Sequence, residues 1–237
     1  MYQGKELHHF YHIGSSGKWL QPLSEHIHAL KRYGLLENLD SINFGIIGLT
    51  ENRELVKKYL SSELDNFNIV AEADQGWEQV TLAPLYEFAL ENDGYVLYAH
   101  TKSSNNHNVF GAKHRRSMTY FNIVNWKDCV DKLNEGYTLA GVHYCQMHLI
   151  KDAYGNELDM PGETQWKNIK DHDGFYLGNF WWITTDGLKT LKPCANNYRQ
   201  DAEFWIAQIK VENKLAYDFY PHQVLTEHEN RFITKWQ

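Results

Sequence analysis

The sequence predicts an α/β fold with a mostly parallel central sheet. Four short apolar segments, at 7–13, 41–47, 67–73 and 95–99, have the composition and length of buried strands. A segment with apolar residues at helical spacing follows each of them. This alternation is typical of a parallel sheet with crossover helices. A chain of 237 residues can bury a sizeable core, and we expect a single domain over 1–237.

The helices of the first half follow from apolar spacing and from signals at helix ends. Apolar residues at helical spacing predict a first helix that Gly34 ends, and Thr50 is the expected N-cap of the second. Pro84 lies early in the third helix, where proline is tolerated. The expected spans are 19–33, 50 to about 60, and 77–91.

The second half of the chain is less regular. Its longest polar segment contains Gly155 and Pro161, and loops of this length in compact domains are usually functional or variable in conformation. The residues from Tyr217 onward show no clear period. The expected elements are a helix at 111–133 with a break near 122–125, a strand at 138–145, a loop at 147–173, a strand at 175–184, and helices at 186–191 and 199–210.

Composition narrows the class of protein. A net charge of −7 gives no broad basic surface, so we expect no nucleic-acid partner. The cysteines Cys129, Cys145 and Cys194 are odd in number and widely spaced, which indicates neither a zinc knuckle nor a disulfide framework. No apolar run is long enough to cross a membrane. We therefore expect a cytoplasmic protein, with peripheral membrane association left open.

The loop after the fourth strand is the first candidate site. In parallel sheets, ligands bind outside the carboxyl ends of the strands. There, Lys102 could neutralise a phosphate, Thr101 could hydrogen-bond to it, and His100 could ligate a metal or donate a proton. The alternative is a polar turn that only ends the strand.

The second candidate site lies in the last third of the chain. Trp181 and Trp182, beside Asn179, would suit the wall of a pocket that takes a sugar ring; the alternative is a strand whose aromatic residues pack in the core. Asp201 and Glu203 are two residues apart, so on a helix their side chains diverge and only one can face a given site.

Other chemistries have little support. The sequence lacks the glycine-rich dinucleotide motif, the phosphate-binding lysine loop and the nucleophile elbow, which disfavours dehydrogenases, P-loop enzymes and α/β-hydrolases. No pair of histidines has the spacing of a zinc hydrolase. Two looser groups remain as weaker metal candidates: His8 with His9 and His12, and His222 with His228.

Several motifs, in this order and spacing, resemble a group of bacterial and viral glycosyltransferase-like proteins related to rhamnan-synthesis and lipopolysaccharide-type transferases. The His-Thr-Lys and Gly-Asn-Phe-Trp-Trp motifs together are the most specific part of the resemblance. The matching residues are Tyr11-His12-Ile13, Glu78 with Thr81-Leu82, Leu97-Tyr98-x-His100-Thr101-Lys102, Arg115 with Met118, Tyr120 and Trp126, Gly141, Gly178-Asn179-Phe180-Trp181-Trp182, and Arg199 with Ala202-Glu203 and Trp205-Ile206.

The resemblance implies a GT-A-like α/β/α sandwich. Residues 1 to about 110 would bind the nucleotide sugar, and 111–237 would bind the acceptor and carry catalysis. The implied donor-binding residues are Tyr11, His12, Lys18, Glu78, Thr81, His100, Thr101 and Arg115. The implied acceptor-binding residues are Asn179, Trp181, Trp182 and Arg199. By analogy with inverting enzymes, Glu203 is the first choice for the general base and Asp201 the second.

The main departure from the family concerns metal binding. Many such transferases hold Mn²⁺ or Mg²⁺ with Asp-x-Asp, whereas this chain has His100-Thr101-Lys102 at that place. Either His100 helps to hold a metal, or Lys102, helped by Arg115 or Arg116, stabilises the leaving diphosphate by charge.

The expected function is sugar transfer from a nucleotide-sugar donor to a saccharide or glycan acceptor. Two alternatives stay open. One is a carbohydrate-binding domain without catalysis. The other is a nucleotidyltransferase, which the Gly14–Lys18 loop partly resembles.

Overall fold

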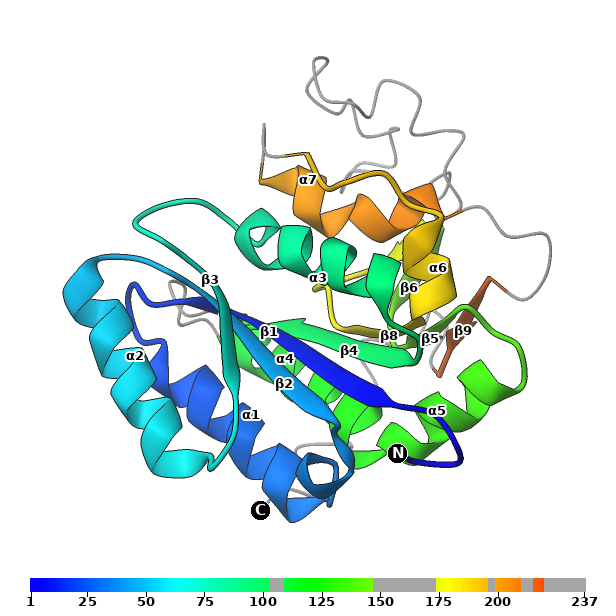
Figure 1. Cartoon of the computed structure of the whole chain (residues 1–237), viewed down its shortest axis with the longest axis horizontal. Coiled ribbons are helices and arrows are strands. Elements are labelled where there is room, and N and C mark those ends of the chain that lie inside the picture. Colours follow the sequence, from blue (N-terminus) through cyan, green and yellow to red (C-terminus); the bar gives the residue numbers. More distant parts are fainter. Residues whose placement is uncertain (103–108, 147–173, 196–198, 210–214, 220–237) are drawn as a thin grey trace.

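The protein has three layers, a central seven-stranded sheet with helices on each of its two faces (Figure 1). The computed structural model describes residues 1–102, 109–146, 174–195, 199–209 and 215–219. The strand order is β3-β2-β1-β4-β8-β5-β9. Its strands are β1 (Leu7–Gly14), β2 (Ser41–Ile47), β3 (Asn68–Ala73), β4 (Tyr95–His100), β5 (Leu139–Gly141), β8 (Trp181–Thr184) and β9 (Ala216–Asp218).

The sheet is mostly parallel, as the sequence predicts. β1 pairs in parallel with both β2 and β4, β2 with β3, and β5 with β9. Only β8 runs against its neighbours β4 and β5. The strands β1 and β4 are buried on both faces because helices cover both sides of the sheet. This arrangement is the α/β sandwich expected of a GT-A-like fold.

The helices divide between the two faces of the sheet (Figure 1). One face carries α1 (Leu20–Arg32), α2 (Thr50–Glu63), α4 (Val109–Thr119) and α5 (Trp126–Asn134), with a short 3-10 turn at Leu36–Asn38. The other face carries α3 (Gln79–Glu91), α6 (Thr185–Lys189) and α7 (Gln200–Glu203). A π-helical turn at Tyr120–Val124 separates α4 from α5, which is the break expected in that helix.

The apolar core follows the same division. On the face of the sheet that α1 covers, the core includes three residues of α1 at the spacing that predicts the helix, Leu23, Ile27 and Leu30. Leu82 and Leu85 of α3 pack on the opposite face. Within the described part of the chain, no helix is both long and apolar enough to cross a membrane.

Two expected strands are each broken by a backbone turn. Residues 138–145 form β5 and then β6 (Tyr144–Gln146), because His143 has a left-handed φ of 68°. Residues 175–184 form β7 (Gly174–Tyr176) and β8, because Gly178 and Asn179 have φ of 88° and 58°. β6 and β7 pair with each other in a separate small sheet. Glycine and asparagine tolerate this conformation better than other residues, so the turn falls where the sequence allows it.

Other expectations are corrected in detail. The helix expected at 199–210 is the short α7 followed by a 3-10 turn at Trp205–Gln208. α2 begins at Thr50, and the N-cap is Leu49. The 147–173 loop, most of 217–237, and the pair His222 and His228 lie outside the described residues.

Candidate active site

The candidate site lies at the point in the sheet where neighbouring strands are connected in opposite directions. From β1 the chain crosses to β2 on one side, whereas β4 lies on the other side of β1. The carboxyl ends of β1 and β4 therefore form a topological switch point, the place where open α/β sheets bind ligands. His12 and His100 are register partners across these two strands. The sequence-predicted loops 14–18 and 100–102 meet at this point.

Backbone and side-chain hydrogen bonds fix the turn after β4. The Thr101 N–H donates to the His12 carbonyl at 3.0 Å, and the Gly14 N–H donates to Thr101 Oγ1 at 2.8 Å. The Lys102 N–H donates back to the His100 carbonyl at 2.7 Å. Thr101 is buried and ties the first strand to the fourth, whereas the side chain of Lys102 is partly exposed. The turn thus presents a cation next to the loop that Gly14 begins.

His100 lies beneath this turn and is held by the protein. Its Nε2 donates to the Gly178 carbonyl at 2.9 Å, and its Nδ1 lies 3.5 Å from Glu78 Oε1. Burial, with the nearby Lys102 cation, lowers the pKa of His100 to about 3, against the opposing charge of Glu203. The imidazole is therefore neutral at neutral pH.

The His12 side chain is also neutral, and it is buried in the interior of the protein. Its Nδ1 lies 2.8 Å from Thr81 Oγ1 at the start of α3. Burial lowers the pKa of His12 to about 4, while the Glu78 carboxylate acts in the opposite direction. α3 lies close to the sheet here. A Cβ added to Gly45 of β2 would overlap the Thr81 side chain, so glycine permits this close approach. The packing of α3 thus places Thr81 and Glu78 over the ends of β1 and β4.

Glu78 is the most connected acidic side chain at this edge. Its Oε2 accepts from the Tyr98 hydroxyl at 3.0 Å and from Asn179 Nδ2 at 2.5 Å. The side chain is only 12% exposed. Tyr98 is a site-forming residue to which the sequence analysis gave no role. Its position two residues before His100 on a strand puts both side chains on one face, and that signal was present in the sequence.

Arg115 does not present a free guanidinium to a ligand. It is buried, and its Nε and Nη2 donate to Glu25 Oε2 at 3.1 and 2.8 Å. Its Nη1 donates to the Lys102 carbonyl at 3.0 Å. Arg115 thus supports the backbone that carries Lys102 and does not itself face the site. Arg116 is the exposed member of the pair, 3.7 Å from Glu25 Oε1.

Tyr11 and Lys18 are both expected to bind the donor, but they lie in different environments, Tyr11 in the core and Lys18 at the surface. Tyr11 precedes His12 on β1, so its side chain points to the opposite face, where it packs against His26 and Phe44. It is completely buried and belongs to the core beneath α1, not to the donor site. Lys18 is exposed in the loop after Gly14, and its role in donor binding stays a prediction.

The double tryptophan is buried core. Trp181 and Trp182 are neighbours on β8 and point to opposite faces, so they belong to different core clusters. Both are completely buried. Trp181 stacks on Tyr98 with ring centroids 4.8 Å apart and donates its N–H to Asn179 Oδ1 at 2.6 Å. Trp182 donates its N–H to the Asn122 carbonyl at 2.8 Å. Neither ring has a face open for stacking on a sugar, and the core interpretation fits their burial.

Asn179 is likewise committed to protein contacts. Its amide joins Glu78 Oε2, the Trp181 indole and the Ala202 carbonyl, the last at 3.3 Å. It is buried, so its amide is not available to an acceptor. Its role in this structure is to hold the turn between β7 and β8 against α7.

The acidic candidates of α7 differ in exposure. Asp201 is buried, whereas the Glu203 side chain is 28% exposed. Arg199 is 66% exposed and its Nη2 lies 3.6 Å from Glu203 Oε1. Glu203 raises the pKa of His100, and Arg199 lowers it. Of the two carboxylates, Glu203 is the more exposed.

The described residues do not form a divalent-metal site. No group of three or more His, Cys, Asp or Glu side chains gathers to hold an ion in the described ranges. Both ring nitrogens of His100 face protein atoms, and Mn²⁺ or Mg²⁺ prefers oxygen ligands. His8, His9 and His12 each face a different partner, respectively Ser41, His26 and Thr81.

Comparison with known proteins adds little to these observations. No family model matches the sequence, and no curated protein matches it. A search of solved structures finds the crystal structure of 4-diphosphocytidyl-2C-methyl-D-erythritol synthase from Anaerococcus prevotii, with 11% sequence identity and a TM-score of 0.47. That match covers 98% of this chain and 98% of the other.

Proposed function

We propose that the protein is a glycosyltransferase that moves a sugar from a nucleotide-sugar donor to a hydroxyl of a saccharide or glycan acceptor. One observation carries the proposal. Lys102 is a partly exposed cation in the turn that follows β4, Glu203 is a partly exposed carboxylate of α7, and both charges act on the neutral His100 at the end of β4. A cation and a base of this kind suit a transfer from a diphosphate leaving group.

The proposed reaction uses these two groups in sequence. Glu203 removes the proton of the acceptor hydroxyl as the oxygen attacks the anomeric carbon of the donor sugar. The bond from that carbon to the diphosphate oxygen breaks, and the diphosphate leaves with the electron pair. Lys102, with Lys18 from the neighbouring loop, offsets the negative charge that develops on it. Arg199 lies beside Glu203 and is suited to bind an anionic or hydroxyl-rich part of the substrates.

A nucleotidyltransferase is the second candidate, favoured by the Gly14-Ser15-Ser16-Gly17-Lys18 loop directly after β1. In that reaction a nucleoside triphosphate would lose pyrophosphate, whereas the proposed reaction releases a nucleoside diphosphate. The released product therefore distinguishes the two candidates.

The test begins with calorimetric titration of nucleoside diphosphates, nucleoside triphosphates and nucleotide sugars, each with and without Mn²⁺. Under the proposal, one family of nucleoside diphosphate and its sugar conjugates binds, and incubation with glycan acceptors yields that diphosphate. Release of pyrophosphate from a triphosphate would favour the nucleotidyltransferase instead. Binding of glycans with no affinity for any nucleotide would contradict both and indicate a carbohydrate-binding domain.

A further inference from the structure

The Glu78 carboxylate points into the protein and contacts parts of the chain that are distant in sequence. It lies at the N-terminal end of α3, yet it contacts His100 and Tyr98 of β4 and Asn179 of the turn before β8. Burying a carboxylate is costly unless strong donors satisfy it. Two donors reach Oε2, from the Tyr98 hydroxyl and the Asn179 amide, whereas the His100 ring beside Oε1 faces it with its unprotonated Nδ1. This amount of compensation indicates a structural task at this place.

Asn179 extends the connection to α7. Its Nδ2 donates both to Glu78 Oε2 at 2.5 Å and to the Ala202 carbonyl at 3.3 Å. Ala202 stands between Asp201 and Glu203 in the sequence. Asn179 holds a left-handed φ of 58°, a conformation that persists only when its surroundings fix it. The Trp181 indole, which donates to Asn179 Oδ1 at 2.6 Å, completes that fixation.

We propose that Glu78 is a positioning residue that holds α7, and with it Glu203 and Arg199, in place against the turn carrying Lys102. It does so through Asn179 on one side and the Tyr98 hydroxyl of β4 on the other. Glu78 thus connects the two parts of the site, α7 and the strand β4 that leads to Lys102, and we assign it no contact with the donor. The consequence for catalysis rests on the proposed function, whereas the consequence for the placement of α7 does not.

The positioning is expected to affect turnover more than nucleotide binding. Lys102 and the loop after Gly14 are fixed by other contacts, from Thr101 and Arg115. Loss of the Glu78 carboxylate would leave them in place. It would release the Asn179 turn and α7, so that Glu203 no longer stands at a fixed distance from the donor. Misplacement of a reacting group by about 1 Å can lower a rate about a hundredfold.

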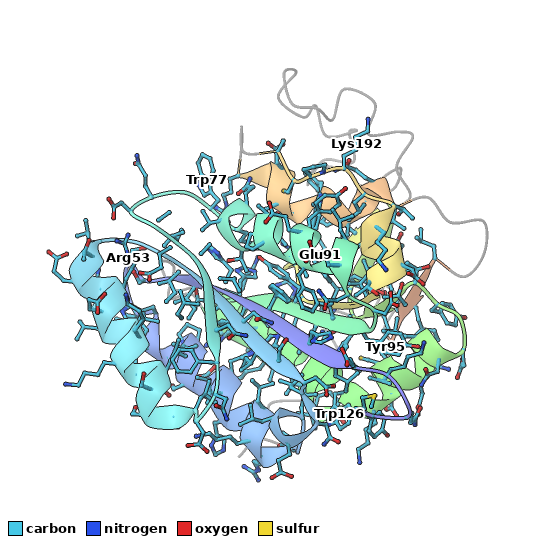
Figure 2. The ribbon with its side chains drawn as sticks, in the orientation of Figure 1. Arg53, Trp77, Glu91, Tyr95, Trp126 and Lys192 are labelled. Atoms are coloured by element: carbon cyan, nitrogen blue, oxygen red, sulfur yellow. The ribbon has the colours of Figure 1, made fainter. Side chains whose placement is uncertain are left out.

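The first arm of the test measures hydrogen exchange and needs no activity. In Glu78→Ala, the backbone amides of 200–209 are expected to exchange about tenfold faster or more, since a hydrogen bond to a buried charge is lost. Glu78→Gln keeps an oxygen for Tyr98 and Asn179, and its amide can donate to His100 Nδ1, so this variant should restore near-normal exchange. Glu91→Ala is the matched control and should change nothing, because Glu91 is exposed and ends α3, whereas Glu78 is its N-cap. Figure 2 shows Glu91 and Trp77, the residue before Glu78 in the sequence.

The second arm measures binding and turnover. Glu78→Ala is expected to keep nucleotide affinity within about threefold while turnover falls about a hundredfold, and Asn179→Ala should behave alike. The double variant should be little worse than either single variant, because both act through one connection. Glu78→Gln should recover most of the turnover.

Two results would overturn the proposal. One is a Glu78→Ala variant with unchanged exchange in 200–209. The other is a loss of nucleotide affinity that matches the loss of turnover, which would make Glu78 a donor ligand. If Glu78→Ala does not fold, Asn179→Ala carries the same comparison. A wild-type protein without transferase activity would contradict the proposed function alone, because the exchange arm still tests the role of Glu78.

Discussion

Replacing His12 by asparagine should weaken the pH dependence of stability in mildly acidic solution. The His12 ring is buried against Thr81, and burial lowers its pKa to about 4 from the ordinary value of 6.5. Between these two values the unfolded chain binds a proton at this position and the native protein does not. The stability that depends on the neutral His12 is therefore fully present above pH 6.5, and it is lost as the pH falls toward about 4.

The magnitude follows from this window. One proton of difference corresponds to a slope of about 1.4 kcal/mol per pH unit in the free energy of unfolding. Over the whole window His12 removes about 3 kcal/mol, a large share of the stability of an ordinary domain. Asparagine can keep a hydrogen bond to Thr81 Oγ1 but does not titrate. His12→Asn should therefore lower the slope by about 1.4 kcal/mol per pH unit, whatever its effect at neutral pH.

The assay is urea unfolding followed by circular dichroism at several pH values between about 4.5 and 7. The slope of the unfolding free energy against pH is compared between wild type and variant, so that contributions from other groups cancel. His28→Asn, at an exposed position of α1, is the control and should keep the wild-type slope. An unchanged slope in His12→Asn would refute the inference that the buried imidazole is neutral in the native state.

Three further substitutions test other parts of the account. Trp181→Ala should cost about 3–5 kcal/mol in urea unfolding, because the indole is completely buried; a loss of sugar affinity without loss of stability would restore its place in the pocket. Arg115→Ala should cost about 1–2 kcal/mol and weaken nucleotide binding through the Lys102 turn, and equal affinity in wild type and variant would contradict that link. Gly45→Ala should cost about 1–3 kcal/mol by displacing Thr81, and a thermal unfolding temperature equal to wild type would contradict the close approach of α3.

The sheet could be predicted from the sequence because its strands are buried on both faces. β4 appears as a short, largely apolar segment, β1 as one in which aromatic residues and histidines lie between Leu7 and Ile13, and helical spacing marks the elements between them. The general rule for such sheets predicts a site at the ends of β1 and β4, and that position stays a prediction. The orientation of Trp181 and Trp182 was also within reach, because neighbours on a strand face opposite sides.

The connections of the site could not be predicted in the same way. Arg115 finds its partner Glu25 at a distance of 90 residues, and Asn179 meets Glu78 across 101 residues. Such pairs depend on how helices pack on the sheet, and local sequence carries no signal for it. The left-handed turn at Asn179, by contrast, had a local signal in the Gly178-Asn179 pair inside the expected strand 175–184.

The central claim is that Glu203 acts as a base on an acceptor beside a donor held at the β1/β4 switch point. The most direct measurement is the rate of sugar transfer by Glu203→Gln at saturating donor, with donor affinity determined on the same sample. The account predicts unchanged donor affinity and a transfer rate lower by about a hundredfold or more. A variant that binds the donor and transfers sugar at a rate close to wild type would contradict it.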